Sequence, residues 1–470
     1  MSKRSYFILA YTAVMMLLLT GCKKKAEQMP VPAPVYDDGI TVSNNVPEVK
    51  PVIITGAGVY EVSGSKRAMI VNSEGDATFE VISAKKDRVV YSGKIRYKRN
   101  RNEEDDIVAV CDFTDLKKKG SYYIKTDTGT QSDVFHIKKG LYKELLSGRL
   151  DHFADQPARD DITEDNIGQC YMCITDRLLA QELFPDSVSP VVSDTVPKTL
   201  LIAKAQIDKL REYYDEDNMT RAFLHSDTGR QYQYAAVFAM FAYDYEEYDD
   251  AYAAECTQIA GAVYDIAEQN YEKGMYSATQ TCDDKRFWAS AQLYKLTGEE
   301  QYKQTAESYA GANPNGLQKG FEEGSSGYLG TVAYLTCYHK IDLDVAEILI
   351  TNLMNDINTV VKQSREDDYL AAAPDKNNEE ETVNKVFENA RLVVLGNYIS
   401  KSIAYVECGE NQLSYLYGRN ELGKDYAYAD DSVYYNEPQE FILAGLIDSY
   451  IYEDREPEAA AGKQNKKTGK

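Results

Sequence analysis

The residues from Tyr434 to Tyr450 read YYNEPQEFILAGLIDSY. Pro438 suits the first turn of a helix, where its missing N–H costs nothing, and the apolar residues after it recur at helical spacing. The stretch predicts a helix with one buried face, formed by Phe441, Ile442, Leu446, Ile447 and Tyr450. Burial of that face would hold the start of the helix, and with it the carboxylate of Glu437, in a fixed place. An ordinary capping acid is the alternative interpretation of Glu437.

The helical period extends from this stretch back to Leu141. We predict helices over residues 142–153, 170–182, 199–214, 232–243, 251–269, 287–296, 300–309, 327–338, 344–361, 388–405, 411–417 and 438–452. Consecutive helices joined by loops pack as hairpins, so residues 141–453 are expected to form one all-α domain. A repeat solenoid is the alternative, although the sequence has no self-similarity at a fixed period.

Before Leu141 the pattern changes to short segments rich in Val, Ile and Tyr. Such segments lie at residues 77–82, 88–96, 107–113 and 121–125, separated by glycine or charged turns. Short strands at this spacing predict a small β-sandwich over residues 52–138. No catalytic grouping is recognisable in it, so a spacer or stabilising role is expected.

The N-terminus has the features of an export signal. Lys3 and Arg4 precede an apolar run from Tyr6 to Leu19, and a small residue stands before Cys22. Residues 1–22 therefore look like a bacterial lipoprotein signal peptide with lipidation at Cys22, which predicts an exported protein anchored in a membrane at the cell surface. The run is short for a bilayer, so a spanning anchor is the weaker alternative.

Two further segments contain few apolar residues. Residues 23–51 begin with lysines and continue proline-rich, which predicts an extended linker. Residues 454–470 are expected to form a disordered tail.

The acidic composition limits the expected partners. The formal net charge is −23 and the pI is near 4.7. No basic patch is recognisable that would release counterions, so nucleic acid and anionic lipid are not expected partners. Neutral ligands fit better. The chain has 38 tyrosines and one tryptophan, and tyrosine rings suit carbohydrate as well as ordinary cores.

The cysteines and acidic pairs make a metal site a minor alternative. Apart from Cys22, the cysteines are scattered and odd in number, which predicts no regular disulfide framework. Cys170 and Cys173 form a lone CxxC, for which two semi-buried thiols are a better interpretation than a zinc site. No cofactor is expected, although acidic loops such as Asp283–Asp284 leave a structural calcium ion open.

Three stretches of the helical region are specific rather than only periodic. They are QYAAVFAMFA at residues 233–242, RFWASAQLYKLTGEEQY at residues 286–302 and YLYGRNELGKDY at residues 415–426. Together with Asn436–Glu437 they resemble the catalytic domain of glycoside hydrolase family 9. The preceding sandwich resembles the immunoglobulin-like domain of bacterial cellulases. The resemblance implies a multi-domain fold: an all-β immunoglobulin-like sandwich, then an all-α toroid of about six helical hairpins with a substrate cleft at one end.

The resemblance also implies a chemistry. Enzymes of this kind invert the anomeric centre with two carboxyl groups, one as acid and one activating water, about 6.5–9.5 Å apart. Glu437 matches the general acid, since it falls in the Asn-Glu pair before the last helix. Tyrosine rings beside it would raise its pKa toward a useful range. Substrate contacts are assigned to Tyr434, Tyr435, Arg419 and Asn436.

The second carboxyl group is where the sequence departs from the family. The family carries a Gly-Gly-Trp-x-Asp-Ala-Gly-Asp type of loop, and residues 191–200 here read VVSDTVPKTL. When the family loop is aligned through Lys198 and the helix that follows it, the two aspartates of the loop fall on Val192 and Thr195 of this sequence. The only aspartate nearby is Asp194. Asp194 is therefore the candidate base, with an acid on a loop that caps a helix as the alternative. Further departures are the missing His-His-Arg segment and the missing tryptophans of the cleft. The lone Trp288 matches a packing position of the family and is expected in the core.

Two function hypotheses are favoured over a third, a surface protein whose acidic helical domain docks another protein, because nothing in the sequence specifies such a partner. The first is a surface glycoside hydrolase acting on β-1,4-glucan or a related polysaccharide. The second is a catalytically impaired glycan-binding or scaffold lipoprotein that kept the fold. In both the partner is a polysaccharide or oligosaccharide, and the membrane is reached through Cys22.

Overall fold

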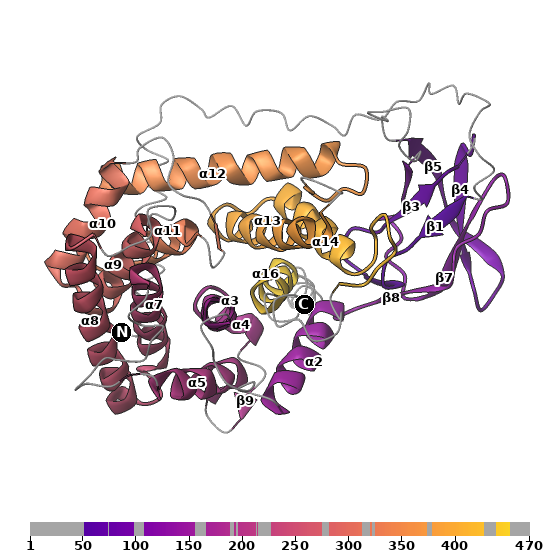
Figure 1. Cartoon of the computed structure of the whole chain (residues 1–470). Coiled ribbons are helices and arrows are strands. Elements are labelled where there is room, and N and C mark those ends of the chain that lie inside the picture. The colour runs from indigo at the N-terminus through magenta and orange to yellow at the C-terminus, as the bar shows by residue number, and fades with distance from the viewer. Residues whose placement is uncertain are drawn as a thin grey trace, which may run out of the picture. The chain divides into compact units, whose positions relative to one another are not determined.

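The computed structural model describes residues 51–73, 75–97, 108–155, 166–188, 192–193, 196–212, 214, 227–274, 282–312, 320–321, 325–373, 378–426 and 439–451. The chain folds as two compact units. The central unit includes Leu150–Asp356, and the terminal unit includes Pro32–Arg149 together with Ile357–Lys470. Figure 1 labels their helices and strands.

The N-terminal part of the terminal unit is a β-sandwich. Its strands are β1 Val52–Ile54, β2 Val59–Glu61, β3 Arg67–Val71, β4 Thr78–Ser83, β5 Arg88–Tyr97, β6 Val108–Asp112, β7 Gly120–Thr126 and β8 Phe135–Lys138. They are hydrogen-bonded in the order β1-β3-β6-β5-β4-β7-β8-β2. β5 pairs with β4 along its first part and with β6 over Ile95–Tyr97, so this long strand belongs to both layers. β2 and β8 are parallel, and every other pair is antiparallel.

Aromatic side chains fill the space between the two layers. The rings of Tyr60, Phe113 and Phe135 lie 5.2–5.4 Å apart, centroid to centroid, and Tyr60 meets the other two edge-on. Edge-to-face packing is the arrangement that aromatic rings favour. The four strands expected at residues 77–125 are confirmed as β4 to β7. β1, β2 and β3 were not expected, because two of them have three residues each, too few to show an alternation.

The central unit is helical. Its elements are α3 Ile167–Leu183, α4 Pro185–Val188, α5 Lys198–Arg211, α7 Thr228–Tyr245, α8 Asp250–Glu272, α9 Asp283–Thr297, α10 Glu300–Ala312 and α11 Gly327–Leu335, with two short strands, β9 Val192–Ser193 and β10 Val196–Pro197. α7 packs against α3, α5, α8 and α9. The helical unit was expected to contain no strands, and the β9–β10 pair corrects that.

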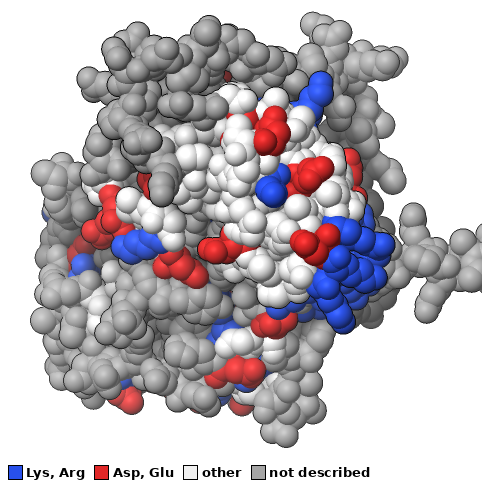
Figure 2. Space-filling model, turned by 90° about the vertical axis from the view of Figure 1, so that its right-hand side faces the viewer, with Lys and Arg blue, Asp and Glu red and all other residues white. Residues whose placement is uncertain are grey.

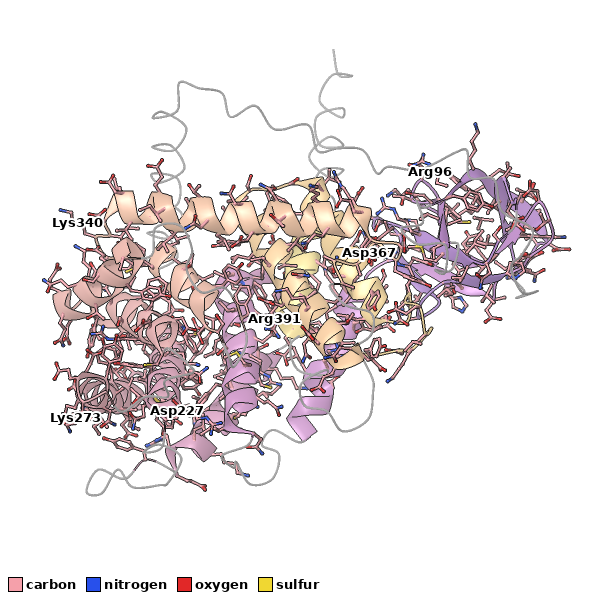
Figure 3. All side chains as sticks on the ribbon, turned by 45° about the horizontal axis from the view of Figure 1, so that its top comes forward. Arg96, Asp227, Lys273, Lys340, Asp367 and Arg391 are labelled. Atoms are coloured by element: carbon pink, nitrogen blue, oxygen red, sulfur yellow. The ribbon has the colours of Figure 1, made fainter. Side chains whose placement is uncertain are left out.

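α7 and α9 form the interior of the central unit. Residues 233–242 of α7, the first of the three specific stretches, are all buried, so this helix is apolar on every side rather than amphipathic. Asp227, labelled in Figure 3, caps α7 by accepting a 2.8 Å hydrogen bond from the amide of Gly229. Trp288 on α9 is fully buried, as expected.

The terminal unit adds three helices that pack together, α13 Glu379–Ile399, α14 Ile403–Leu416 and α16 Gln439–Ile451. α2 Leu141–Asp155 and α12 Leu343–Glu366 each contribute one end to this unit. The single helix expected over residues 388–405 is wrong. Ser400 is extended, and the amide of Ser402 instead binds Oδ1 of Asn397 at 3.0 Å, which separates α13 from α14.

No helix among these residues is long and apolar enough to cross a membrane. The signal peptide, the linker and the C-terminal tail expected from the sequence lie outside the described residues.

Candidate active site

The first turn of α16 is anchored in the interior of the terminal unit. Gln439 and Glu440 are fully buried, and so is the rest of the helix through Ile447. The helix expected from the sequence is therefore present, but it is buried on all sides in this part rather than on one face. Glu437, the candidate general acid, stands two residues before Gln439 and lies outside the described residues.

A hydrogen bond ties this first turn to the third specific stretch, residues 415–426. The hydroxyl of Tyr417 donates to Oε1 of Gln439 at 2.8 Å, and both groups are buried. A buried hydrogen bond of this kind is costly to break, because the group left behind has no water to bind. The start of α16 is therefore held by the segment that follows α14.

That segment is a tight turn built around Asn420. Its side-chain amide donates to the carbonyls of Tyr415 (2.8 Å) and Lys424 (2.7 Å), and its Oδ1 accepts from the amides of Leu422 and Lys424. Gly418 has a φ of 92°, a conformation that side chains with a Cβ rarely adopt. Asn420 thus replaces the hydrogen bonds that a regular element would supply.

The sandwich packs against this turn. A Cβ added to Gly56, in the turn between β1 and β2, would lie 3.3 Å from the carbonyl oxygen of Tyr417 and 3.4 Å from Cβ of Arg419. Gly56 also has a φ of 66°, so its backbone conformation favours glycine as well. The sandwich is therefore in direct contact with the segment that fixes α16.

Arg419, expected to bind substrate, is 1% exposed. Its Nη2 donates to the carbonyl and to Oδ1 of Asn411, both at 3.1 Å, and to the carbonyl of Tyr369 at 3.4 Å. Burial lowers the pKa of Arg419 to about 10. Asp367, labelled in Figure 3, holds the Tyr369 turn by accepting from its amide at 2.9 Å. These contacts favour a positioning role for Arg419, and the substrate contact stays a prediction.

For the other site residues expected from the sequence, the structure gives no positions. Asp194, Tyr434, Tyr435, Asn436 and Cys22 all lie outside the described residues. The segment before Asp194 is β9 and the segment after Thr195 is β10, which pairs with β9 in antiparallel fashion. α5 begins directly afterwards, at Lys198, the residue used to set the register with the family loop.

A second buried polar cluster lies in the central unit and was not expected. Lys295 on α9 is fully buried and forms an ion pair with Glu182 on α3. Its Nζ also donates to Oγ1 of Thr336 at 2.8 Å and lies 4.6 Å from the ring centroid of Tyr243. The signal in the sequence was Lys295 within the largely apolar stretch FWASAQLYKL at residues 287–296, since a buried cation requires a partner.

Asp244 on α7 belongs to the same cluster. Burial, and then the neighbouring Glu182 carboxylate, raise the pKa of Asp244 well above its usual value, and Lys295 opposes them. Its Oδ2 is buried without a hydrogen-bond partner. The cluster therefore carries one cation for two carboxyl groups, which favours a protonated Asp244.

The residues considered for metals have other roles. Asp284 is fully buried and accepts the amide of Ser326 at 2.6 Å, and Asp283 accepts the hydroxyl of Tyr271 at 2.7 Å. Cys173 is buried and Cys170 half-buried, and neither forms a disulfide bond. Among the described residues no group of His, Cys, Asp and Glu is arranged to hold a metal ion.

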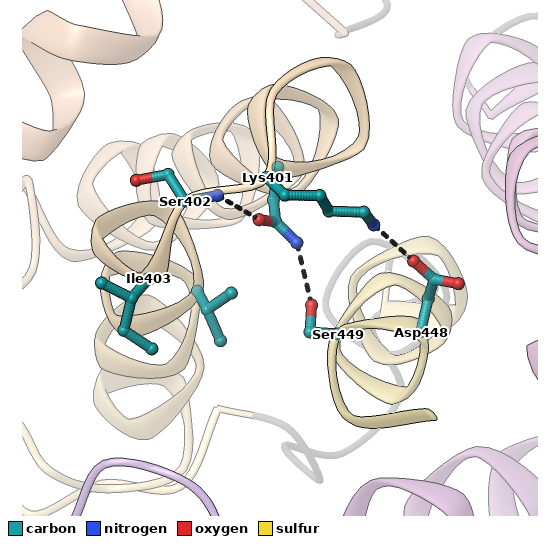
Figure 4. A pocket seen from close by; sticks show the side chains of 7 residues that line it. Lys401, Ser402, Ile403, Asp448 and Ser449 are labelled. Atoms are coloured by element: carbon teal, nitrogen blue, oxygen red, sulfur yellow. Dashed lines mark hydrogen bonds and ion pairs between the residues drawn. The ribbon is translucent and has the colours of Figure 1, made fainter. Parts of the chain in front are cut away.

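A pocket of about 570 Å³ lies at the opposite end of α16 from Gln439. Figure 4 shows Lys401 paired with Asp448 at 2.6 Å beside it, and Ser449 accepting from the amide of Asn397 at 3.0 Å. In its lining, Lys401 is paired with Asp448 and Asn397 with Ser449.

Comparison with known proteins bears on both parts of the chain. The model of the family "Glycosyl hydrolase family 9" matches residues 200–460, and that of the "Cellulase N-terminal ig-like domain" matches residues 57–131. "Endoglucanase D" of Acetivibrio thermocellus is 20% identical over 451 residues, covering 77% of this chain and 70% of that protein.

Solved structures agree on the fold. A metagenome-derived glycoside hydrolase family 9 endoglucanase has a TM-score of 0.70 at 16% identity, covering 84% of this chain and 99% of its own. AaCel9A in complex with cellobiose-like isofagomine has a TM-score of 0.69 at 15% identity, covering 84% and 100%. The protein "Bacteroides ovatus GH9" has a TM-score of 0.69 at 16% identity, covering 85% and 98%. The expected fold class, an immunoglobulin-like sandwich followed by an α/α barrel, is confirmed.

Proposed function

Because the chain belongs to glycosyl hydrolase family 9, we propose that it hydrolyses β-1,4-glucan or a related polysaccharide with inversion at the anomeric centre. Glu437 is the general acid that protonates the leaving oxygen. Asp194 is the base that activates water on the opposite face of the sugar ring. The proposal concerns an endo-acting enzyme, in keeping with the endoglucanases that the chain resembles.

The anchored first turn of α16 is the observation that carries this proposal. An acid must be held within a few tenths of an ångström of the leaving oxygen to be effective. The turn directly after Glu437 is fully buried and bonded to Tyr417. Rigid support of this kind, two residues from an acid in the family's Asn-Glu pair, is what a general acid requires.

The proposed substrate class is inferred from the solved structures that the chain resembles. The structural neighbour AaCel9A was solved with cellobiose-like isofagomine. A β-glucan is therefore the first substrate to test here, and the abundant tyrosines supply rings on which sugars stack.

The test measures reducing ends released from a panel of β-glucans. We expect activity from the wild-type chain and a loss of about a hundred- to ten-thousandfold in Glu437→Gln, because proton transfer is removed while the shape is kept. Asp194→Asn should lower activity over the same range. Circular dichroism and thermal unfolding serve as controls for the fold. Equal inactivity of wild type and Glu437→Gln across the panel would exclude the hydrolase.

A catalytically impaired glycan-binding protein is the second candidate. It is favoured by Val192 and Thr195, which stand at the two positions where the family carries aspartates. Affinity electrophoresis in polysaccharide gels tests retention without catalysis. Under this second candidate Thr195→Asp, which restores one carboxyl group, should raise hydrolysis above wild type. Failure to be retained by any polysaccharide would count against it.

We further propose that the protein is exported and held at the cell surface through a lipid on Cys22. The support is the apolar run that ends in Leu-Thr-Gly before Cys22. Cys22→Ala should block incorporation of labelled fatty acid and move the protein from the membrane fraction to the soluble fraction. Unchanged membrane association and labelling would contradict the anchor.

A further inference from the structure

Two basic runs that lie about thirty residues apart in the sequence meet at one end of the β-sandwich. The first is Lys85–Lys86, in the turn between β4 and β5, together with Arg88 at the start of β5. The second is Lys117–Lys119, which directly precedes β7. We call these six side chains the lysine edge.

The strand register brings the runs together. Ser83, the last residue of β4, pairs with Tyr122 of β7, and the amide of Ala84 donates to the carbonyl of Ser121 at 3.0 Å. The residues that follow Ser83 therefore lie beside the residues that precede Ser121. The hydroxyl of Tyr122 fixes the second run by donating to the carbonyls of Lys118 (2.9 Å) and Lys119 (3.2 Å).

The lysine edge is open to solvent and poorly neutralised. All six side chains are exposed. Lys117 donates to the carbonyl of Ser63 at 2.9 Å, and none of the six forms an ion pair with another described residue. The acids next to the two runs in the sequence are Asp115 and Asp87, and Asp87 accepts the hydroxyl of Tyr123 at 2.8 Å.

Figure 2 shows a compact group of basic side chains on the face it presents, whereas the other charges there are scattered and mixed in sign. The expectation from composition that no basic patch exists is therefore wrong. A net charge of −23 is a sum over the whole chain and says nothing about one edge.

We propose that the lysine edge docks on an anionic phospholipid surface. A cluster of four to eight basic side chains near a membrane anchor is the arrangement that binds acidic headgroups, each contributing about 1 kcal/mol. The sandwich is the first domain after the proposed lipid on Cys22. Residues 23–51 between them reach at most about 100 Å when extended, so an anchor would keep the edge close to the bilayer.

The proposed anchor favours a membrane over a soluble polyanion. A tether raises the effective concentration of the bilayer at the lysine edge, and a free polyanion has no such advantage. Docking through this edge would set the orientation of the sandwich at the surface. The inference extends the proposed anchoring and is independent of hydrolysis.

The experiment uses the chain from residue 23 onward, which contains every described residue and carries neither signal peptide nor lipid. Sedimentation is measured with vesicles of equal parts phosphatidylglycerol and phosphatidylcholine, and with phosphatidylcholine alone. We expect binding only to the anionic vesicles, weakening as salt rises. The triple variant K86Q/K118Q/K119Q should bind about a hundredfold more weakly, at about fivefold for each lysine removed.

The matched control is K94Q/K125Q/K143Q, which removes the same charge from exposed lysines outside the edge. It should bind within about twofold of wild type, because attraction between exposed charges is local. Equal weakening in the two triple variants would overturn the proposal. So would equal binding to both vesicle types, no binding at low salt, or edge-dependent binding to polygalacturonate without binding to vesicles.

Discussion

The hydroxyl of Tyr417 donates a 2.8 Å hydrogen bond to Oε1 of Gln439, which joins the turn after α14 to the first turn of α16. Tyr417 in turn touches the sandwich through Gly56. The start of the last helix is thus fixed by a contact that begins in the immunoglobulin-like domain. That domain is a structural support for α16 and more than a spacer.

Tyr417→Phe should lower the free energy of unfolding by about 1–3 kcal/mol, because the buried Oε1 of Gln439 loses its donor. If the bond also positions the acid, kcat on β-glucan should fall with KM unchanged. Urea unfolding and steady-state kinetics measure the two effects. Tyr405→Phe is the control, since its 3.0 Å bond to Asn358 is exposed. Equal effects of the two variants would contradict a specific role of the hydrogen bond between Tyr417 and Gln439.

Substitution of Glu410 on α14 should lower the free energy of unfolding of the terminal unit more than most other substitutions of polar residues. Its buried carboxylate accepts from the amide of Ser65 (2.8 Å) and from the hydroxyls of Tyr142 (2.8 Å) and Tyr450 (2.6 Å). Glu410→Leu leaves three donors without an acceptor and should cost about 3 kcal/mol or more. Thermal and urea unfolding provide the measurement.

The control for Glu410 is Glu407→Leu on the same helix. Glu407 is partly exposed and lies 3.3 Å from Arg67, so this variant should cost about 1 kcal/mol or less. A change at Glu410 no larger than that at Glu407 would show that the three hydrogen bonds do not stabilise the terminal unit.

Lys295→Met should destabilise the central unit by about 3–5 kcal/mol, because it leaves Glu182 buried without its cation. Adding Glu182→Gln should recover most of that loss, and a double-mutant cycle of unfolding free energies measures the coupling. Lys303→Met, which removes a partly exposed lysine 3.7 Å from Glu300, is expected to cost about 1 kcal/mol or less. Additive losses in the cycle would disprove the coupling.

Glu268 should make the central unit sensitive to acid. Burial alone would raise its pKa, but Arg286, which donates at 2.7 and 2.6 Å, and the hydroxyl of Tyr232 bring the pKa of Glu268 below its usual value. A carboxylate whose pKa is lowered by folding stabilises above its unfolded pKa of about 4.3, and that contribution is lost as pH falls through the folded pKa.

The urea midpoint should therefore fall more steeply between about pH 5 and pH 3 in wild type than in Glu268→Gln. Asp265→Asn is the control on the same helix, since burial raises the pKa of Asp265 and gives the opposite sign. Parallel pH profiles for wild type and Glu268→Gln would rule out the Glu268 carboxylate as the source of the acid sensitivity.

The sequence by itself determined the features that depend on local pattern. Helical spacing located α16 and α7, the β-rich composition located β4 to β7, and the motif around Trp288 correctly placed that ring in the core. Periodicity is a property of residues close together in the sequence, so it can be recognised without any knowledge of the fold. The break between α13 and α14 was missed, because it depends on one side-chain bond from Asn397.

Only the tertiary structure decided which distant residues meet. Lys295 finds Glu182 across 113 positions, and Arg419 is buried against the Asn411 and Tyr369 carbonyls instead of facing outward. The lysine edge exists because β4 and β7 pair in one register, and a shift of that register would separate the two runs. Composition averages charge over the chain, whereas electrostatic attraction acts over about 10 Å, so the position of each charge had to come from the fold.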